Sequence, residues 1–350
     1  MRKFDYSSLK EKKWDSEIIS LVAQIHEYKG RQEIYLKQKP EELDKLIEIA
    51  KRQSTEASNA IEGIRTTSTR LRQLCEEKTT PKNRDEEEIL GYRDVLNTIH
   101  ENYEYIPIRA NYILQLHRDL YKYTEKNIGG HFKVSQNVIA ATDEKGKEYV
   151  LFTPLAPYET PSAIDDICEN YNKMIDSEEL DSLLLIPIFI HDFLCIHPFS
   201  DGNGRMSRLL TALLLYRSGY VVGKYISIEN KIAKNKDLYY KALENCQDGW
   251  HENKEDVTSF VKYMLRIILA SYRDFEERVE LVSKKIPAKE IVRRAIYNKI
   301  GKITKSDVVE LCPSIGKKSV ELALKQLVEE GALIKKGNGR ATFYVRSDSE

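Results

Sequence analysis

The stretch HPFSDGNGRMSR, residues 197–208, gathers side chains that could act on a phosphate ester. The imidazole of His197 has an ordinary pKa near neutrality, so it can take a proton from an attacking hydroxyl. Asp201 supplies a carboxylate, which would repel phosphate unless a cation such as Mg²⁺ lies between them. Arg205 and Arg208 are three residues apart, so both side chains can extend from one helix toward the same anion. Their planar guanidinium groups present pairs of N–H donors that match phosphate oxygens.

The glycines of this stretch favour a turn that leads into a helix. Pro198 disfavours a continued helix at His197, and Gly202 and Gly204 allow backbone angles that other residues resist. A helix that restarts at about residues 204–206 points free N–H groups and its positive dipole end at a guest above it, and phosphate is the natural guest. The residues therefore predict metal-assisted phosphoryl or nucleotidyl transfer.

Residues 197–208 match HxFx[DE]GNGRxxR at every specified position, and this pattern resembles the signature of the Fic family. In that family the fold is a helical bundle, and the usual reaction moves AMP from ATP to a Ser, Thr or Tyr hydroxyl of a target protein, with release of pyrophosphate. The resemblance implies that His197 is the general base and Asp201 the Mg²⁺ ligand. It also implies phosphate-binding roles for the other motif residues: Gly202, Asn203 and Gly204 as the anion hole, and Arg205 and Arg208 at the β- and γ-phosphates.

Two further segments resemble parts of the family. GGHFKVSQNVIAA through FTPLAP is similar to the family's flap, a hairpin that clamps the target segment by strand pairing. Four of its residues are then implied to lie near the nucleotide: Val138, Ile139, Ala140 and Ala141. KDLYYKALENCQ is similar to a later segment in which Tyr239 packs near the base, and Gln247 stands where relatives offer an asparagine.

SNAIEG, residues 58–63, resembles the family's inhibitory motif [ST]xxxE[GN], placed N-terminal to the core as in its second class. Ser58 and Glu62 are one turn apart on a helix face, and Gly63 can end that helix. Glu62 is expected to pair bidentately with Arg208 and deny it to the γ-phosphate.

The elements that position these residues are mainly helical. Apolar side chains recur at one-turn spacing over residues 14–62, with Pro40 in a helical first turn. Two runs with strand character, 134–140 and 148–152, predict a hairpin whose turn holds Asp143 and Gly146. Further helices are expected over residues 85–100, 108–123, 162–176, 181–196, 204–218, 235–247 and 254–280.

The C-terminal tail predicts a winged helix, with three short helices (287–299, 304–311 and 316–330) before two strands around a Gly-Asn-Gly-Arg turn. From residue 285 onward it holds 14 basic and eight acidic side chains, although Lys plus Arg equals Asp plus Glu over the whole chain. We therefore expect a mainly α protein with an N-terminal inhibitory helical region (1–80), a Fic-type catalytic domain with its β-hairpin flap (81–282) and an α+β winged helix (283–350).

Composition places this protein in the cytoplasm and away from membranes. Five widely spaced cysteines argue against a disulfide framework or a cysteine zinc site: Cys75, Cys168, Cys195, Cys246 and Cys312. The N-terminus has no apolar core of the signal-peptide type. The strongest apolar run, 183–196, is too short for a membrane span and is interrupted by His191 and Asp192, so we expect a buried helix.

Rival functions stay open at this level. The winged helix could make the chain a DNA-binding regulator, with phosphate contacts from Lys317, Lys318, Lys325, Lys335, Lys336 and Arg340. A Fic-type enzyme could instead remove AMP or transfer another phosphate-containing group. The implied partners are ATP, Mg²⁺ and an unknown target protein on the flap, with self-modification and a homodimer left open.

Overall fold

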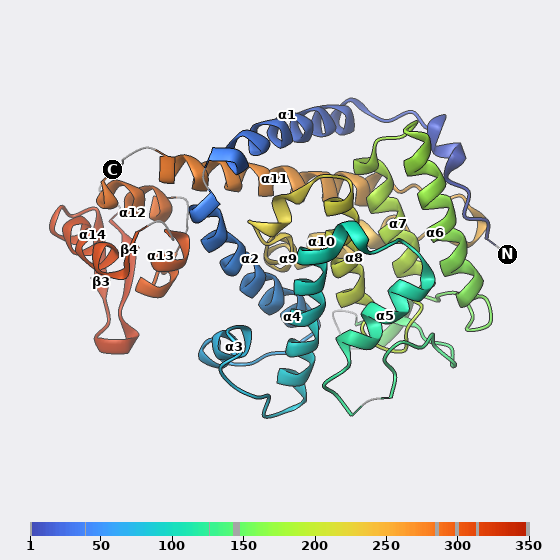
Figure 1. Ribbon diagram of the computed structural model, residues 1–350, viewed down its shortest axis with the longest axis horizontal. Coiled ribbons are helices and arrows are strands. Elements are labelled where there is room, and N and C mark those ends of the chain that lie inside the picture. Colours follow the sequence, from blue (N-terminus) through green and yellow to red (C-terminus); the bar gives the residue numbers. More distant parts are fainter. Residues whose placement is uncertain are drawn as a thin grey trace. The chain divides into compact units, whose positions relative to one another are not determined.

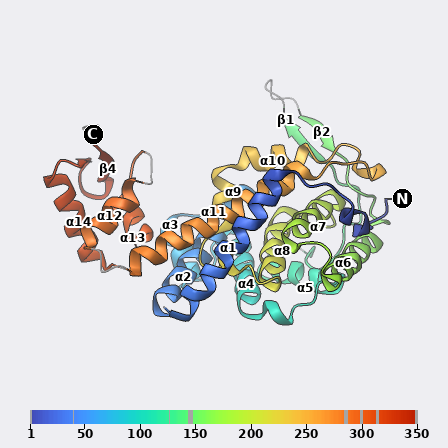
Figure 2. The same ribbon diagram turned by 90° about the horizontal axis from the view of Figure 1, so that it is seen from above.

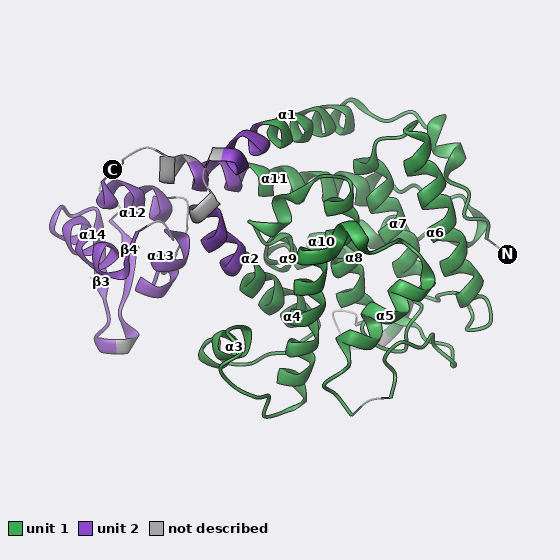
Figure 3. Cartoon of the chain, in the orientation of Figure 1, with its two compact units in different colours: residues 1–30, 50–272 green, residues 31–49, 273–350 purple. Residues whose placement is uncertain are grey.

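The computed structural model describes residues 2–38, 40–125, 127–142, 148–283, 287–297, 301–312 and 315–347. The chain is mainly helical and divides into two compact units (Figure 3). Unit 1 comprises residues 1–30 and 50–272, and unit 2 comprises residues 31–49 and 273–350. The domain boundaries expected from the sequence near residues 80 and 282 remain a prediction, because a division into compact units does not define functional domains.

Helices account for most of the described residues (Figure 1). The α-helices up to the end of α11 are α1 (Ser16–Gln38), α2 (Pro40–Ile61), α3 (Ser68–Cys75), α4 (Arg84–Asn102), α5 (Ala110–Leu120), α6 (Thr160–Ser177), α7 (Ser182–Ile196), α8 (Asn203–Arg217), α9 (Ile228–Lys234), α10 (Lys236–Glu244) and α11 (Thr258–Ser283). Short 3₁₀ helices are η1 (Tyr6–Lys10), η2 (Tyr103–Tyr105), η3 (Val221–Lys224), η4 (Trp250–Glu252) and η5 (Gly339–Ala341). The predicted helices are present, whereas the short α3 and α9 were not predicted.

Helix α7 forms the centre of unit 1. Its residues Leu183 to Ile196 are all buried, as the uninterrupted apolar run predicted. It lies between α6 and α8 (Figures 1 and 2), and α8 packs in turn on α4. The chain leaves α7 at His197 and enters α8 at Asn203, so the motif loop is mounted on two helices of the core.

The hairpin of unit 1 consists of β1 (Ile139–Thr142) and β2 (Glu148–Phe152), paired antiparallel. It projects from the body of the unit (Figure 2). The second strand lies where it was predicted, but the expectation of a strand over residues 134–140 was wrong for most of that run, since β1 begins at Ile139. The side chains of Lys133 and Asn137 bond instead to the motif loop. The predicted turn around Asp143 and Gly146 lies outside the described residues.

The C-terminal elements of unit 2 follow the predicted order. They are α12 (Ala288–Tyr297), α13 (Lys305–Leu311), α14 (Lys317–Glu329), β3 (Leu333–Lys336) and β4 (Phe343–Arg346). The strands pair antiparallel, and Ile303 forms a bridge to Tyr344 of β4. A core that includes Val292, Val320 and Leu324 joins the three helices.

The five cysteines form no disulfide within the described residues. Four of them are buried, and Cys75 is half-buried. None of the described helices is both long enough and apolar enough to cross a bilayer.

Candidate functional site

The loop between α7 and α8 places His197 at a sharp change of direction. His197 is the C-cap of α7 and has a left-handed backbone (φ 50°), a conformation that β-carbon-bearing residues rarely adopt. Pro198 follows it and cannot continue a helix. The Asn203 side chain then closes the loop, because its Oδ1 accepts from Phe199 N at 2.9 Å and its Nδ2 donates to Phe199 O at 2.7 Å.

The imidazole of His197 is prepared to act as a base. Its Nδ1 lies 3.2 Å from the carbonyl oxygen of Leu194, so Nδ1–H donates there and the neutral ring keeps its lone pair on Nε2. Burial, with a smaller contribution from the positive charge of Lys133, lowers the pKa of His197 to about 4, although the Leu194 carbonyl and Glu62 act in the opposite direction. At neutral pH the ring is therefore unprotonated.

The N-terminus of α8 forms an anion cradle next to this imidazole. Gly202 is the N-cap, with φ 85° and no side-chain cap hydrogen bond. Because the first helical bond runs from Met206 N to Gly202 O, the preceding N–H groups have no acceptor within the helix. A β-carbon at Gly202 would lie 2.9 Å from the Tyr121 hydroxyl, so both the backbone angle and the space require glycine.

A cavity of about 830 Å³ opens over this cradle. Thirteen of the sequence-predicted site residues line it: Glu62, Gly63, Ile139, Ala140, His197, Asp201, Gly202, Asn203, Gly204, Arg205, Arg208, Tyr239 and Gln247. Ser58 lies behind Arg208, Val138 is about half exposed, and the side chain of Ala141 is outside the described part of the chain. The structure thus brings together residues from α2, the hairpin, the motif loop and α10.

Asp201 is the carboxylate of the cradle. Its Oδ1 accepts from Gly202 N at 2.7 Å, and its Oδ2 lies 3.9 Å from Arg84 Nη2. No group of three or more His, Cys, Asp or Glu that could hold a metal occurs in the described ranges. A lone carboxylate nevertheless fits Mg²⁺, because that ion is commonly held by one or two carboxylates together with substrate phosphates and water.

Arg205 is buried and held by partners that local sequence did not indicate. Its Nη2 lies 2.8 Å from Glu88 Oε2 on α4 and donates to the Tyr121 hydroxyl at 2.7 Å. Its Nε and Nη1 have no hydrogen-bond partner among the described residues. The guanidinium therefore keeps donor groups that a phosphate oxygen could satisfy.

Arg208 contacts the end of α2. Its Nε donates to Ser58 Oγ at 2.8 Å, and its Nη2 donates to Ser58 O at 2.9 Å and to Glu62 Oε1 at 2.8 Å. The expectation of a bidentate pair with Glu62 was wrong, because the fork is divided between Ser58 and Glu62. Gly63, with φ 82°, ends the helix just beyond, as predicted.

Gly204 leaves the space that the Glu62 carboxylate uses. A β-carbon at residue 204 would lie 2.3 Å from Glu62 Oε1 and 3.4 Å from Arg208 Nη1. The glycine of the anion cradle is therefore also required for the approach of Glu62 to Arg208. Spacing within the motif could not indicate this second requirement.

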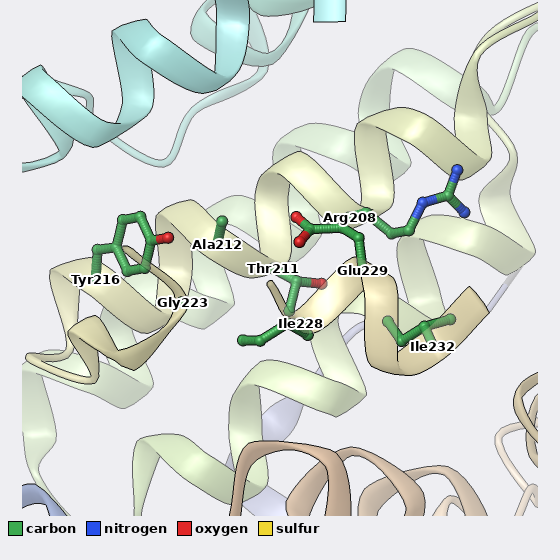
Figure 4. A pocket seen from close by; sticks show the side chains of 8 residues that line it. All are labelled: Arg208, Thr211, Ala212, Tyr216, Gly223, Ile228, Glu229 and Ile232. Atoms are coloured by element: carbon green, nitrogen blue, oxygen red, sulfur yellow. The ribbon is translucent and has the colours of Figure 1, made fainter. Parts of the chain in front are cut away.

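A small cavity of about 10 Å³ lies behind Arg208, lined by Arg208, Thr211, Ala212, Tyr216, Gly223, Ile228, Glu229 and Ile232 (Figure 4). The Glu229 carboxylate points toward α8, whereas the Arg208 guanidinium extends away from it. Glu229 Oε2 accepts from Ser54 Oγ at 2.6 Å, and its Oε1 accepts from the Tyr92 hydroxyl at 3.3 Å. Ser54 precedes Ser58 by one turn of α2, so this buried carboxylate anchors the end of that helix.

The large cavity is also lined by aromatic and amide groups. Tyr239 is buried and Tyr240 is partly exposed, and both line the cavity. The Oε1 atom of Gln247 is buried without a hydrogen-bond partner in the described structure. An unsatisfied buried acceptor in a cavity is available to a ligand donor such as an exocyclic amine.

His117 is a core histidine whose two ring nitrogens both have hydrogen-bond partners. It is fully buried and stacked on Phe199 with ring centroids 3.7 Å apart. Its Nδ1 accepts from Gly130 N at 3.0 Å, so Nε2–H donates to Asp201 O at 3.1 Å. Its contacts therefore support the motif loop from below.

Comparison with known proteins finds similarity to one family over the part of the chain that holds the motif loop. Residues 107–215 match the profile of the Fic/DOC family. A Fido domain-containing protein of Dictyostelium discoideum is 27% identical over 147 residues, which cover 41% of this chain and 98% of that protein. The protein adenylyltransferase Fic of Drosophila erecta is 26% identical over 217 residues, covering 59% of this chain and 38% of the fly protein, so the match spans well under half of that relative.

Solved structures show the same fold. A crystal structure of a Fic family protein from Desulfovibrio desulfuricans G20 aligns with a TM-score of 0.62 at 20% identity, covering 97% of this chain and 98% of that one. A Fic domain-containing signalling protein from Bacteroides thetaiotaomicron aligns with a TM-score of 0.61 at 24% identity, covering 76% and 97%. At these identities the likeness concerns the fold.

Proposed function

We propose that this chain, whose residues 107–215 match the Fic/DOC family profile, transfers AMP from ATP to a Ser, Thr or Tyr hydroxyl of a target protein. The observation that carries the proposal is the position of His197: its Nε2 lone pair is free of the bond that Nδ1–H makes to Leu194, at the edge of a cavity built on a helix N-terminus. In the transfer, the target hydroxyl gives its proton to Nε2 while its oxygen bonds to the α-phosphorus. The bond from that phosphorus to the bridging oxygen breaks, and pyrophosphate leaves.

The phosphate end of ATP would occupy the α8 cradle. Backbone N–H groups of the first turn and the helix dipole favour an anion there, and Arg205 and Arg208 supply guanidinium donors. Asp201 would hold Mg²⁺, which when bound neutralises phosphate charge. Glu88 would hold Arg205 in place through its Nη2 atom.

The nucleoside end would lie toward α10 and the hairpin. Tyr239 and Tyr240 offer ring surfaces, and the unsatisfied Oε1 of Gln247 suits the adenine amine. Residues 138–141 would close over the nucleotide, with the target segment pairing along the hairpin. An ATP-sized ligand fits the 830 Å³ cavity, because small-molecule sites commonly occupy about 300–1,000 Å³.

The contact between Glu62 and Arg208 would hold this activity low. The carboxylate takes one donor of a guanidinium that the γ-phosphate needs, and it places negative charge where the phosphate should lie. ATP could still bind, but with its α-phosphate badly aimed. A misplacement of about 1 Å can cost on the order of a hundredfold in rate.

The test incubates wild type and Glu62→Gly with α-labelled ATP, Mg²⁺ and cell lysate. We expect roughly a hundredfold more label on protein with Glu62→Gly and none when His197→Ala is added to either background. Glu178→Gly, the same change at an exposed residue after α6, is the matched control and should label like wild type. Equal labelling by wild type and Glu62→Gly would refute the inhibition, and labelling independent of His197 would refute the mechanism.

Mass spectrometry of the labelled target decides between AMP and other phosphate-containing groups, because each adds a different mass. Loss of label from a previously modified target would instead indicate removal of AMP. The DNA-binding alternative concerns unit 2, where Lys317 and Lys318 on α14 and Lys335 and Lys336 on β3 are exposed. Their clustering on one candidate recognition helix and one strand favours phosphate contacts.

A further inference from the structure

Lys133 is a buried lysine next to the motif loop, and no motif predicted a role for it. Only 3% of the surface of Lys133 is exposed to solvent. Its Nζ donates to Ile196 O at 3.0 Å and to Asn137 Oδ1 at 2.9 Å, and its backbone N–H donates to Pro198 O at 2.8 Å. A single residue thus binds the carbonyls on both sides of His197.

Asn137 completes this set of contacts. Its Nδ2 lies 3.3 Å from His197 O and 3.1 Å from Phe199 O. Four consecutive carbonyls, those of residues 196–199, therefore accept hydrogen bonds from a five-residue segment, 133–137. These carbonyls lie where α7 ends and can no longer be satisfied by an advancing helix.

The left-handed backbone of His197 explains why such support is needed. A non-glycine residue with φ near 50° persists only where its surroundings over-determine it. Without bonds to the carbonyls on either side, the peptide planes could rotate and swing the imidazole away from the cradle. Lys133 Nζ bonds to the Ile196 carbonyl oxygen, and His197 but not Lys133 lines the cavity.

The charge of Lys133 adds a second effect. Burial lowers the pKa of Lys133 to about 8, so its ammonium remains mostly protonated at neutral pH. Two charged groups act on His197: Lys133 from the segment before the hairpin, and Glu62 from the end of α2. They oppose each other, and the nearby ammonium favours the unprotonated ring that a general base requires.

We propose that Lys133 is a positioning residue for the transfer reaction, which holds the His197 loop through the Ile196 and Pro198 carbonyls and places an ammonium group near the imidazole. Asn137 assists by binding the carbonyls of His197 and Phe199. The catalytic part of this inference rests on the proposed AMP transfer. The effect of Lys133 on the state of His197 does not.

The first measurement needs no substrate. In protein with ¹⁵N-labelled histidine, NMR follows the titration of His197, whose signals are identified by their loss in His197→Gln. Lys133→Met should raise the midpoint of that titration by about one pH unit relative to wild type, since a neighbouring positive charge has been removed. Lys133→Arg should leave it near the wild-type value. An unchanged midpoint in Lys133→Met would overturn the inference.

The second measurement is single-turnover AMP transfer in the Glu62→Gly background. Lys133→Met should reduce the maximal rate roughly tenfold or more with little change in ATP affinity, because the cradle is untouched. Lys133→Gln, which keeps a donor for Ile196 O but no charge, should retain more rate than Lys133→Met and show the same titration shift. Absence of transfer in Glu62→Gly itself would refute the proposed function while leaving the titration result valid.

Folding is controlled separately. Thermal unfolding identifies any variant that has lost its structure, and Asn137→Ser, which removes the amide contacts but no charge, then replaces Lys133→Met in the rate measurement. Lys173→Met, on the exposed face of α6, is the matched lysine control and should change neither readout. Equal rates for Asn137→Ser, Lys133→Met and the parent would overturn the positioning role.

Discussion

Glu62 Oε1 lies 2.8 Å from Arg208 Nη2, although the two residues are 146 positions apart in the sequence. The contact joins the end of α2 to the helix that begins at the anion cradle, and Ser58 accepts hydrogen bonds from Nε and Nη2 of the same guanidinium. Because Gly204 has no β-carbon, the Glu62 carboxylate at the end of the inhibitory helix can lie against the first turn of the anion cradle.

Gly204→Ala should partly release the inhibition. The new β-carbon would lie 2.3 Å from Glu62 Oε1, and the flexible carboxylate should move away from Arg208. We expect AMP incorporation to rise roughly tenfold, less than with Glu62→Gly. Labelled ATP and a fixed target measure the rate. In the Glu62→Gly background the same change should bring no increase, and an equal increase there would contradict the steric explanation.

Ser54→Ala should loosen the end of α2. It removes a 2.6 Å hydrogen bond to the buried carboxylate of Glu229, and bonds to charged groups contribute about 1.5–3 kcal/mol. Urea unfolding should show a loss of that size, and AMP incorporation should increase because Glu62 is held less firmly. Ser162→Ala, at an exposed serine of α6, is the control. Lower stability without any increase in AMP incorporation would show that the Ser54–Glu229 hydrogen bond stabilises the fold but does not hold Glu62 in its inhibitory position.

Acid should destabilise the fold through buried histidines. Burial lowers the pKa of His100 to about 3 and the pKa of His117, His191 and His197 to about 4. Between the ordinary value near 6.5 and these values, the unfolded chain binds more protons than the folded one, so stability is full above pH 6.5 and falls as the pH drops toward 4. The loss at pH 5 should be on the order of 1–2 kcal/mol per histidine.

Urea unfolding at pH 7 and pH 5 measures this loss. His100→Gln should reduce the difference between the two pH values, whereas a change at the exposed His251 should not. Identical free energies of unfolding at both pH values would show that these rings are already charged in the folded protein.

The full chain should shift labelled duplex DNA at low salt if unit 2 binds nucleic acid. Phosphate contacts by Lys335 and Lys336 would make that shift fall steeply as salt is raised. Reversal of both charges to glutamate should abolish it, and Lys173→Glu in unit 1 should not. A shift that survives the reversal of Lys335 and Lys336 would exclude the strand β3 as its origin.

Local pattern predicted much of the fold. The uninterrupted apolar run 183–196 could only be a buried helix, and Pro198 with the following glycines required a turn after it. The prediction of a strand over residues 134–140 was wrong for most of that run, although its alternation of polar and apolar side chains is typical of a strand. The side chains of Lys133 and Asn137 instead donate hydrogen bonds to the carbonyls of Ile196 and His197, so the strand β1 begins only at Ile139.

The sequence by itself determined the chemistry available here: an imidazole, a carboxylate, two guanidinium groups and a glycine-bearing helix start, because these depend on residue types and spacing within one loop and one helix. Tertiary structure decided the partners. Glu88 holds Arg205, Ser58 and Glu62 divide Arg208, and Lys133 supports His197. Each such contact joins separate elements, so it arises only when the packing of buried apolar faces brings those elements within hydrogen-bonding distance.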